Sequence, residues 1–120
     1  MSINFTEALG VHADALRLRA ERTRVLASNI ANENTPGFQA KDMDFGAVMQ
    51  QMQDSANGEL SLDTDAESLY RVPYHPSRDG NTVEIGVEQA AFSQNASDFQ
   101  ASLTFDNMTL RGLAKAIAGQ

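Results

Sequence analysis

Apolar residues recur at intervals of three and four residues along the first quarter of the chain. Positions 5, 9, 12, 16, 19, 23, 26 and 30 read Phe, Leu, His, Leu, Arg, Thr, Leu and Ile, and five of these eight are apolar. Such spacing places the side chains on one face of an α-helix. We therefore predict an N-terminal helix within residues 1–32, with Asn4 as its N-cap. Its packing residues are expected to be Phe5, Leu9, Leu16, Leu26 and Ile30.

The same spacing returns at the other end of the chain. Positions 92, 96, 99, 103, 106, 110, 113 and 117 read Phe, Ala, Phe, Leu, Asp, Leu, Leu and Ile, and seven of these eight are apolar. Gly119 follows as a candidate C-terminal cap. This pattern predicts a C-terminal helix within residues 88–120. Its packing residues are expected to be Phe92, Phe99, Leu103, Leu110, Leu113 and Ile117.

The two helices together predict a mainly α fold in which they pair as an antiparallel coiled coil and form one discontinuous domain. Polar residues interrupt the apolar rows at His12, Arg19, Thr23 and Asp106. These residues either lie at the edge of the helix interface or fix the register and the choice of partner. In an antiparallel pair, Arg19 and Asp106 fall at similar depth, which allows an ion pair between them. Two lone helices are marginal in water, so copies or partners are expected to add burial.

The middle of the chain, residues 33–87, begins with a turn. In Thr35-Pro36-Gly37-Phe38, Pro36 presets φ for the second turn position and Gly37 accepts the positive φ of the third, which predicts a type II turn. Pro36 also requires the preceding helix to end before Thr35. The turn does not explain Asn29, which comes one helical turn earlier.

Beyond the turn, the pattern predicts a short helix at 46–54 and then a segment without regular structure. Residues 70–74 and 82–87 flank Asp79-Gly80-Asn81, which is typical of a loose β-hairpin or an extended arm. Seven acidic residues between 42 and 67 are accompanied by no Lys or Arg, so we expect this segment to be solvated or mobile. The acidic residues are Asp42, Asp44, Asp54, Glu59, Asp63, Asp65 and Glu67.

Charge and composition argue against several classes of function. A net charge of -7 disfavours nucleic-acid binding, which needs a basic surface. The chain has no Cys and only two His, His12 and His75, and neither has a partner at metal-ligand spacing. The run that starts at Asp63 resembles the opening of a calcium loop, but it lacks the required glycine and closing glutamate. No nucleophile motif or phosphate loop occurs. We predict no enzyme activity, catalytic residue, metal, cofactor or small-molecule substrate.

One stretch carries a specific resemblance. Residues 26–45, LASNIANENTPGFQAKDMDF, resemble the signature that follows the N-terminal helix in the flagellar axial proteins, the family of rod and hook subunits. Residues 70–85 and 99–113 are similar to segments of the family's proximal-rod branch. Phe38 stands where Tyr is common, and this change keeps the ring and loses a hydroxyl. The matching signature positions are Asn29, Ala31, Asn32, Thr35, Pro36, Gly37 and Phe38.

The resemblance implies a structural subunit of the proximal rod of the bacterial flagellar basal body, which assembles helically and transmits torque. The terminal helices would form the inner layer of a tube, and the signature turn would bridge neighbouring subunits. The amides of Asn29 and Asn32 are our candidates for tying that turn to an adjacent helix. Implied partners are copies of the chain, other rod subunits, the adapter to the membrane ring and the type III export gate.

The family also implies a periplasmic rod location, reached by flagellar type III export without a cleaved signal peptide. This fits the absence of a signal-peptide pattern and of an apolar run of about 20 residues. Two alternatives remain at this stage. One is another axial protein of the rod and hook family. The other is a cytoplasmic coiled-coil export chaperone or adaptor, which would be folded and soluble alone.

Overall fold

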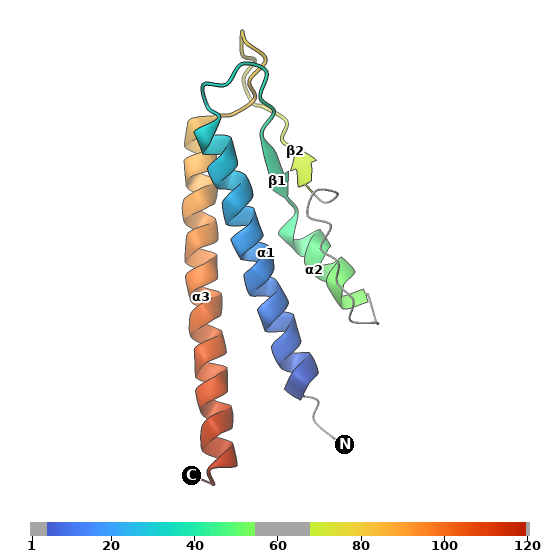
Figure 1. Cartoon of the computed structure of the whole chain (residues 1–120), viewed down its shortest axis with the longest axis vertical. Helices are drawn as coiled ribbons and strands as arrows, with labels where there is room; N and C mark the ends of the chain where they lie inside the picture. The colour runs from blue at the N-terminus through green and yellow to red at the C-terminus, as the bar shows by residue number, and fades with distance from the viewer. Residues whose placement is uncertain (1–4, 55–67, 120) are drawn as a thin grey trace.

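Two long antiparallel helices dominate the computed structural model, which describes residues 5–54 and 68–119 (Figure 1). Helix α1 spans Phe5–Ala31 and helix α3 spans Ile85–Ile117, and the two lie side by side. The described ends of the chain lie at one end of the pair, and the loops lie at the other (Figure 1). The predicted mainly α fold with paired terminal helices is confirmed.

Both helices end as their sequences predict. Asn32 donates from its side chain to the carbonyl oxygen of Ser28 at 2.8 Å, which satisfies one of the last carbonyl groups of α1. The Phe38 N–H then donates to the Thr35 oxygen at 3.2 Å, and Gly37 has a φ of 74°, as a type II turn requires. At the end of α3, Gly119 has a φ of 73°. The predicted cap at Asn4 lies outside the described residues.

The middle of the chain contains a short helix and a two-stranded sheet. Helix α2 spans Phe45–Asp54, which confirms the predicted short helix. Strand β1, Lys41–Met43, pairs antiparallel with strand β2, Ser68–Tyr70. The sequence predicted a hairpin or an extended arm at 70–87, and the hairpin is wrong.

The two limbs of the arm bond to residues 38–43 instead of to each other. Beyond β2, the Arg71 N–H donates to Ala40, and the Thr82 N–H donates to Phe38, both at 2.9 Å. A ladder between the limbs is disfavoured because Pro73 and Pro76 have no N–H to donate. Residues 85–87 instead begin α3.

The buried core lies between α1 and the segment that contains β1 and α2. In Figure 1, α1 runs between α3 and this segment, so two of its faces are covered. The residues of the core cluster come from α1, β1 and α2 and are Leu18, Val25, Met43 and Val48, with Phe45 and Met49 packed against them. The apolar row read from the sequence described only the face of α1 that meets α3, and it therefore missed Leu18 and Val25.

The predicted packing residues are covered to different extents. Leu26 is fully buried, whereas Leu110 is 49% exposed and Ile117 is 87% exposed. Leu110 is thus half covered and Ile117 is mostly exposed, and packing of these two residues against α1 stays a prediction. The side chain of Phe5 itself lies outside the described part. The partly buried members of the set are Leu9, Leu16, Ile30, Phe92, Phe99, Leu103 and Leu113.

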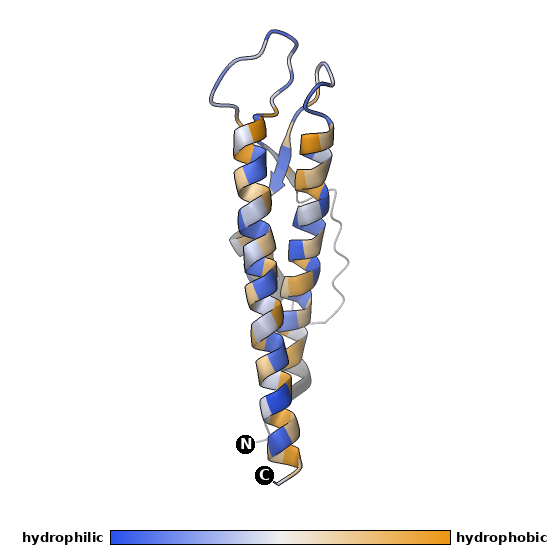
Figure 2. Ribbon diagram, turned by 90° about the vertical axis from the view of Figure 1, so that its left-hand side faces the viewer, coloured by the Kyte–Doolittle hydropathy of each residue, from blue (hydrophilic) through white to orange (hydrophobic). Residues whose placement is uncertain are grey.

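Hydrophobic and hydrophilic residues alternate along both helices, and the loops beyond them are mainly hydrophilic (Figure 2). The helix interface is not a continuous apolar surface, because the buried Glu88 and Asn95 bond to α1 within it. Polar side chains that lie within it form the functional site described next.

Candidate functional site

Polar side chains connect α1 and α3 at four levels along the helix pair. In each case the two residue numbers add to 117 or 118, as expected for one constant antiparallel register. One pair is ionic, Arg19 with Asp98 at 3.4 Å, and in another the His12 Nδ1 lies 3.1 Å from an Asp106 carboxylate oxygen. The other two are hydrogen bonds, from Asn95 to the Thr23 hydroxyl at 2.8 Å and from Asn29 to Glu88 at 2.9 Å.

The ion pair between Arg19 and Asp106 that the sequence allowed is wrong. Its residue numbers add to 125, so it belongs to a register displaced by seven residues, two turns of helix. Arg19 instead lies against Asp98, and its guanidinium also stacks over the Phe45 ring, with 4.0 Å to the ring centroid.

The polar pairs lie at different depths in the interface. The side chain of His12 is 52% exposed, so this pair lies at an edge. Asn95 and Glu88 are fully buried, and Asn29 is 1% exposed. Polar groups at such depth are stable only when they are paired. His12 therefore lies at the edge of the interface, which was the first alternative for the polar interruptions. Thr23 bonds to the buried Asn95, which agrees with the second, a role in fixing the register.

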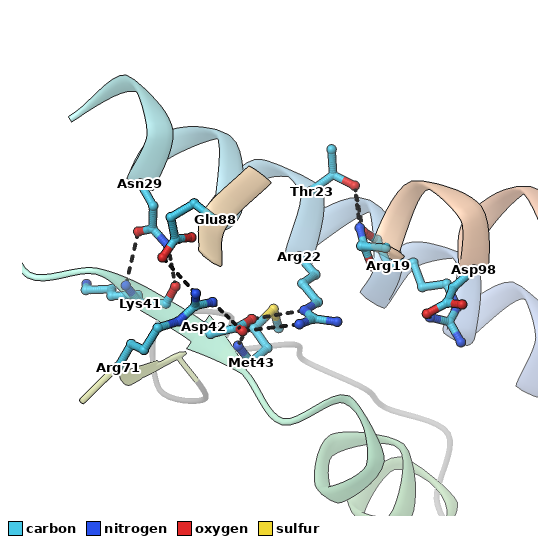
Figure 3. A network of polar contacts seen from close by, with 11 residues as sticks. Arg19, Arg22, Thr23, Asn29, Lys41, Asp42, Met43, Arg71, Glu88 and Asp98 are labelled. Carbon is cyan, nitrogen blue, oxygen red and sulfur yellow. Dashed lines mark hydrogen bonds and ion pairs between the residues drawn. The ribbon is translucent and has the colours of Figure 1, made fainter. Parts of the chain in front are cut away.

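A cluster of charged and amide side chains joins α1, α3 and the sheet near the loop end of the molecule. This polar cluster consists of Arg22, Asn29, Asp42, Arg71 and Glu88. The buried carboxylate of Glu88 lies at its centre, 2.8 Å from a guanidinium nitrogen of Arg71, and accepts a hydrogen bond from Asn29 (Figure 3). Three chain segments that are far apart in the sequence therefore meet at one carboxylate.

Within the polar cluster, Asp42 binds both arginines. Arg22 donates to its two oxygens at 2.9 and 3.2 Å, a bidentate arrangement, and Arg71 donates at 2.7 Å. The expectation that the acidic residues from 42 onward are solvated is thus wrong for Asp42. The two arginines that neutralise it come from α1 and from the segment after β2, outside the stretch that the sequence analysis surveyed.

This environment shifts the ionisation of the pair. Burial raises the pKa of the Asp42 carboxyl, but the hydrogen bonds from Arg22 and the Met43 N–H, with the charges of Arg22 and Arg71, outweigh it. The resulting pKa lies below its ordinary value. The hydrogen bond to Asp42 in turn raises the pKa of Arg22.

Asn29 uses both ends of its amide. Its nitrogen donates to the Lys41 carbonyl at 2.6 Å and to Glu88, and its oxygen accepts from the Lys41 N–H at 3.0 Å. The side chain thus acts towards β1 as a neighbouring strand would. Of the two predicted candidates for tying the turn to a helix, Asn29 joins α1 to β1 and α3, whereas Asn32 bonds locally to Ser28 and Thr35.

Asn81, for which the sequence predicted only a turn, holds the signature loop. The Asn81 amide nitrogen lies within 2.9 Å of the carbonyl oxygens of Asn32, Glu33 and Thr35, and the residue is 6% exposed. The Gly37 N–H also donates to Asp79 at 2.9 Å. The two loops at this end therefore support each other.

The remaining signature residues lie at the surface beside these loops. Phe38 is partly buried. The exposed members are Ala31, Thr35, Pro36 and Gly37. Apart from the Thr35 hydroxyl, which donates to Asn32, the side chains of these exposed residues make no hydrogen bond within the described part of the chain. They are therefore accessible at the surface.

The opposite half of α3 carries a different kind of surface. Phe105 and Met108 are 66% and 64% exposed, although both are large and apolar. They line a groove of about 490 Å³ on the outer side of α3, which we call the outer groove. Its other lining residues are Ser97, Gln100, Ala101 and Thr104. Exposed apolar patches of this kind are typical of sites where proteins associate.

In residues 5–54 and 68–119, no three His, Asp or Glu side chains are close enough to hold a metal ion. No helix in this same portion is long and apolar enough to cross a membrane.

Comparison with known proteins gives one consistent result. Residues 9–39 match the family model described as flagella basal body rod protein. The chain is 45% identical to the flagellar basal body rod protein FlgB of Cereibacter sphaeroides, over 97% of this chain and 98% of the relative. The FlgB protein of Aeromonas hydrophila is 39% identical over 100% and 99% of the two chains. That of Salmonella typhimurium is 35% identical over 93% and 94%.

Asn29→Ala should lower the free energy of unfolding much more than Asn32→Ala. The first change leaves the Lys41 N–H and carbonyl without their side-chain partner and removes one hydrogen bond from the buried Glu88 carboxylate, at a cost of about 3 kcal/mol. The second removes local bonds at a helix end and should cost about 1 kcal/mol or less. Urea unfolding followed by circular dichroism gives both values, and equal losses would contradict the role assigned to Asn29.

Asp42→Asn should change how stability depends on pH. Because the folded state lowers the pKa of Asp42, its charge stabilises the fold above the unfolded pKa, and this contribution is lost as pH falls through the folded value. The parent should exceed the variant by about 1–3 kcal/mol at pH 7, and the gap should close below about pH 4. Unfolding free energies from pH 7 to 2 test this. Glu33→Gln, at an exposed position, is the control, and a gap that persists at pH 2 would contradict the assignment.

Proposed function

Because the chain belongs to the FlgB family of flagellar basal body rod proteins, we propose that the helix pair and the outer groove of α3 are its assembly surfaces in the rod. The protein is a structural subunit of the proximal rod of the flagellar basal body and not an enzyme. Near full-length similarity to one rod protein favours this function over a different axial protein or an export chaperone.

The observation that carries the proposal is the uneven distribution of burial along α3. In the helical row of Glu88 and Asn95, which are both fully buried near the loops, Leu110 and Ile117 further along are 49% and 87% exposed. On the outer side of the same half, Phe105 and Met108 are mostly exposed. A monomer gains little from large apolar side chains in water, whereas a neighbouring helix would bury them. We infer that other rod subunits, including copies of this chain, supply that helix and that the contact transmits torque.

The signature turn is proposed as a second contact. Thr35, Pro36 and Gly37 are exposed at the loop end, and the loop behind them is held by Asn81. A preformed turn loses little entropy when it binds. We infer that it bridges to a neighbouring subunit, while Asn29 acts inside its own chain. If the turn of one subunit binds the outer groove of the next, the contact is heterologous. Contacts of this kind can build an open helical assembly.

Further partners and the route to the rod follow from the family. We propose that the chain reaches the periplasmic rod through the flagellar type III export gate without a cleaved signal peptide. There it would meet the adapter between the rod and the membrane ring. Co-purification with each of these partners would identify the surface that each one uses.

Phe105→Glu should reduce incorporation into the rod without unfolding the monomer. Burying a Phe side chain is worth about 1.5–3 kcal/mol, so its loss together with a buried charge should lower incorporation by about tenfold or more. The amount of subunit in basal bodies, purified from cells that lack the native copy, measures this. Asn107→Glu adds the same charge at another exposed position and should assemble normally. Equal incorporation of the two variants would exclude the outer groove as an assembly surface.

Hydrogen exchange should differ along the helices of the monomer and become more uniform in the rod. In the monomer, amides at 22–31 and 88–95 lie beside the polar cluster and should exchange about tenfold or more slowly than those at 105–117. In isolated basal bodies, residues 105–117 should gain protection, since assembly covers them. Full protection of 105–117 already in the monomer would show that the helix pair is complete without neighbours.

A further inference from the structure

The apolar residues of α1 and α3 fit each other in two registers. In the observed register, Leu9, Leu16 and Leu26 lie level with Leu110, Leu103 and Phe92, since the paired numbers add to about 118. If α3 slipped by seven residues, the same three leucines would lie level with Ile117, Leu110 and Phe99. Each Leu meets a residue of similar size and polarity in both cases. Apolar burial therefore distinguishes poorly between the two registers.

The slip would exchange the Arg19–Asp98 ion pair for one between Arg19 and Asp106, but the buried polar groups distinguish the two registers clearly. After the slip, Asn95 would lie level with Ile30, and its amide would lose the Thr23 hydroxyl and the Arg19 carbonyl, now at 2.8 and 3.0 Å. Glu88 would lie level with residue 37, beyond Ala31, where α1 ends. It would therefore lose the hydrogen bond from Asn29. A buried polar group or charge without a partner is strongly unfavourable, so the slipped register is penalised at both levels.

We propose that Glu88 and Asn95 are specificity-determining residues that select the observed register of α1 and α3. The same two residues would also select the chain's own α3 over a helix of another subunit that offers only an apolar row. One buried polar residue is sufficient to fix register in coiled coils. The slip would move α3 by about 10 Å along α1, at 1.5 Å per residue, and would displace the outer groove relative to the signature turn.

Spin-label distances in the whole chain test the proposal. The chain has no Cys, so Ala27→Cys and Ala114→Cys, both at exposed positions, give two unique labels. The parent with these labels should give one narrow distance. The variant Arg71→Leu/Glu88→Leu/Asn95→Leu removes both members of the buried ion pair and the buried amide, and it should retain its helicity. It should show a second population, shorter by about 10 Å, because the slip brings residue 114 closer to residue 27.

Two further variants make the result decisive. Ser93→Leu/Asn107→Leu adds leucines at exposed positions of α3 and should keep the single parental distance. If the triple variant does not fold, Glu88→Leu/Asn95→Leu removes both selecting residues and leaves Arg71 bound to Asp42, and the proposal then requires the shorter distance in that variant. A single parental distance in a folded triple variant, or in the double variant in its place, would overturn the proposal. The experiment uses the isolated chain, so its outcome is independent of rod assembly.

Discussion

The buried carboxylate of Glu88 is the constraint on which the rest of the structure depends. A carboxylate with no exposed surface is stable only when charge and hydrogen bonds compensate it. Arg71 supplies the charge from the segment after β2, and Asn29 supplies the hydrogen bond from α1. Since Arg71 also binds Asp42, which binds Arg22, one carboxylate couples both helices to the sheet. The elements cannot separate at this end without exposing or unpairing several charges at once.

This coupling explains why the buried residues are concentrated towards the loop end of an elongated molecule. The core cluster, the polar cluster and the Asn81 contacts lie between the middle of α1, at Leu18, and the loops. Further from the loops, α1 and α3 have partly covered apolar rows and one polar contact between the half-exposed His12 and Asp106. A rod subunit built in this way presents a fixed end that positions its helices and an apolar end that neighbours can cover.

The sequence predicted the elements better than their relative placement. Periodicity located α1, α2 and α3, and Pro36 with Gly37 located the turn, because these signals are local. The pairing of Arg19 with Asp106 failed because a seven-residue repeat does not define a register. The hairpin failed because residues 71 and 82 bond to 38–43, a distant segment. The sequence contains one indication of Glu88 and Asn95, since they are polar residues seven apart beside an apolar row. It does not indicate their partners, which only the fold brings near.

The position of Asn29, one turn before α1 ends, follows from the same constraint. Its side chain must donate twice, to the Lys41 carbonyl and to Glu88, and accept once from the Lys41 N–H. Aspartate could accept but not donate, and it would place a second carboxylate beside Glu88. Leucine could do neither, and glutamine would carry the amide one carbon further from the helix. Asparagine alone among side chains of this size meets all three requirements. Asn29, which the turn alone does not explain, is therefore required by the carboxylate of Glu88.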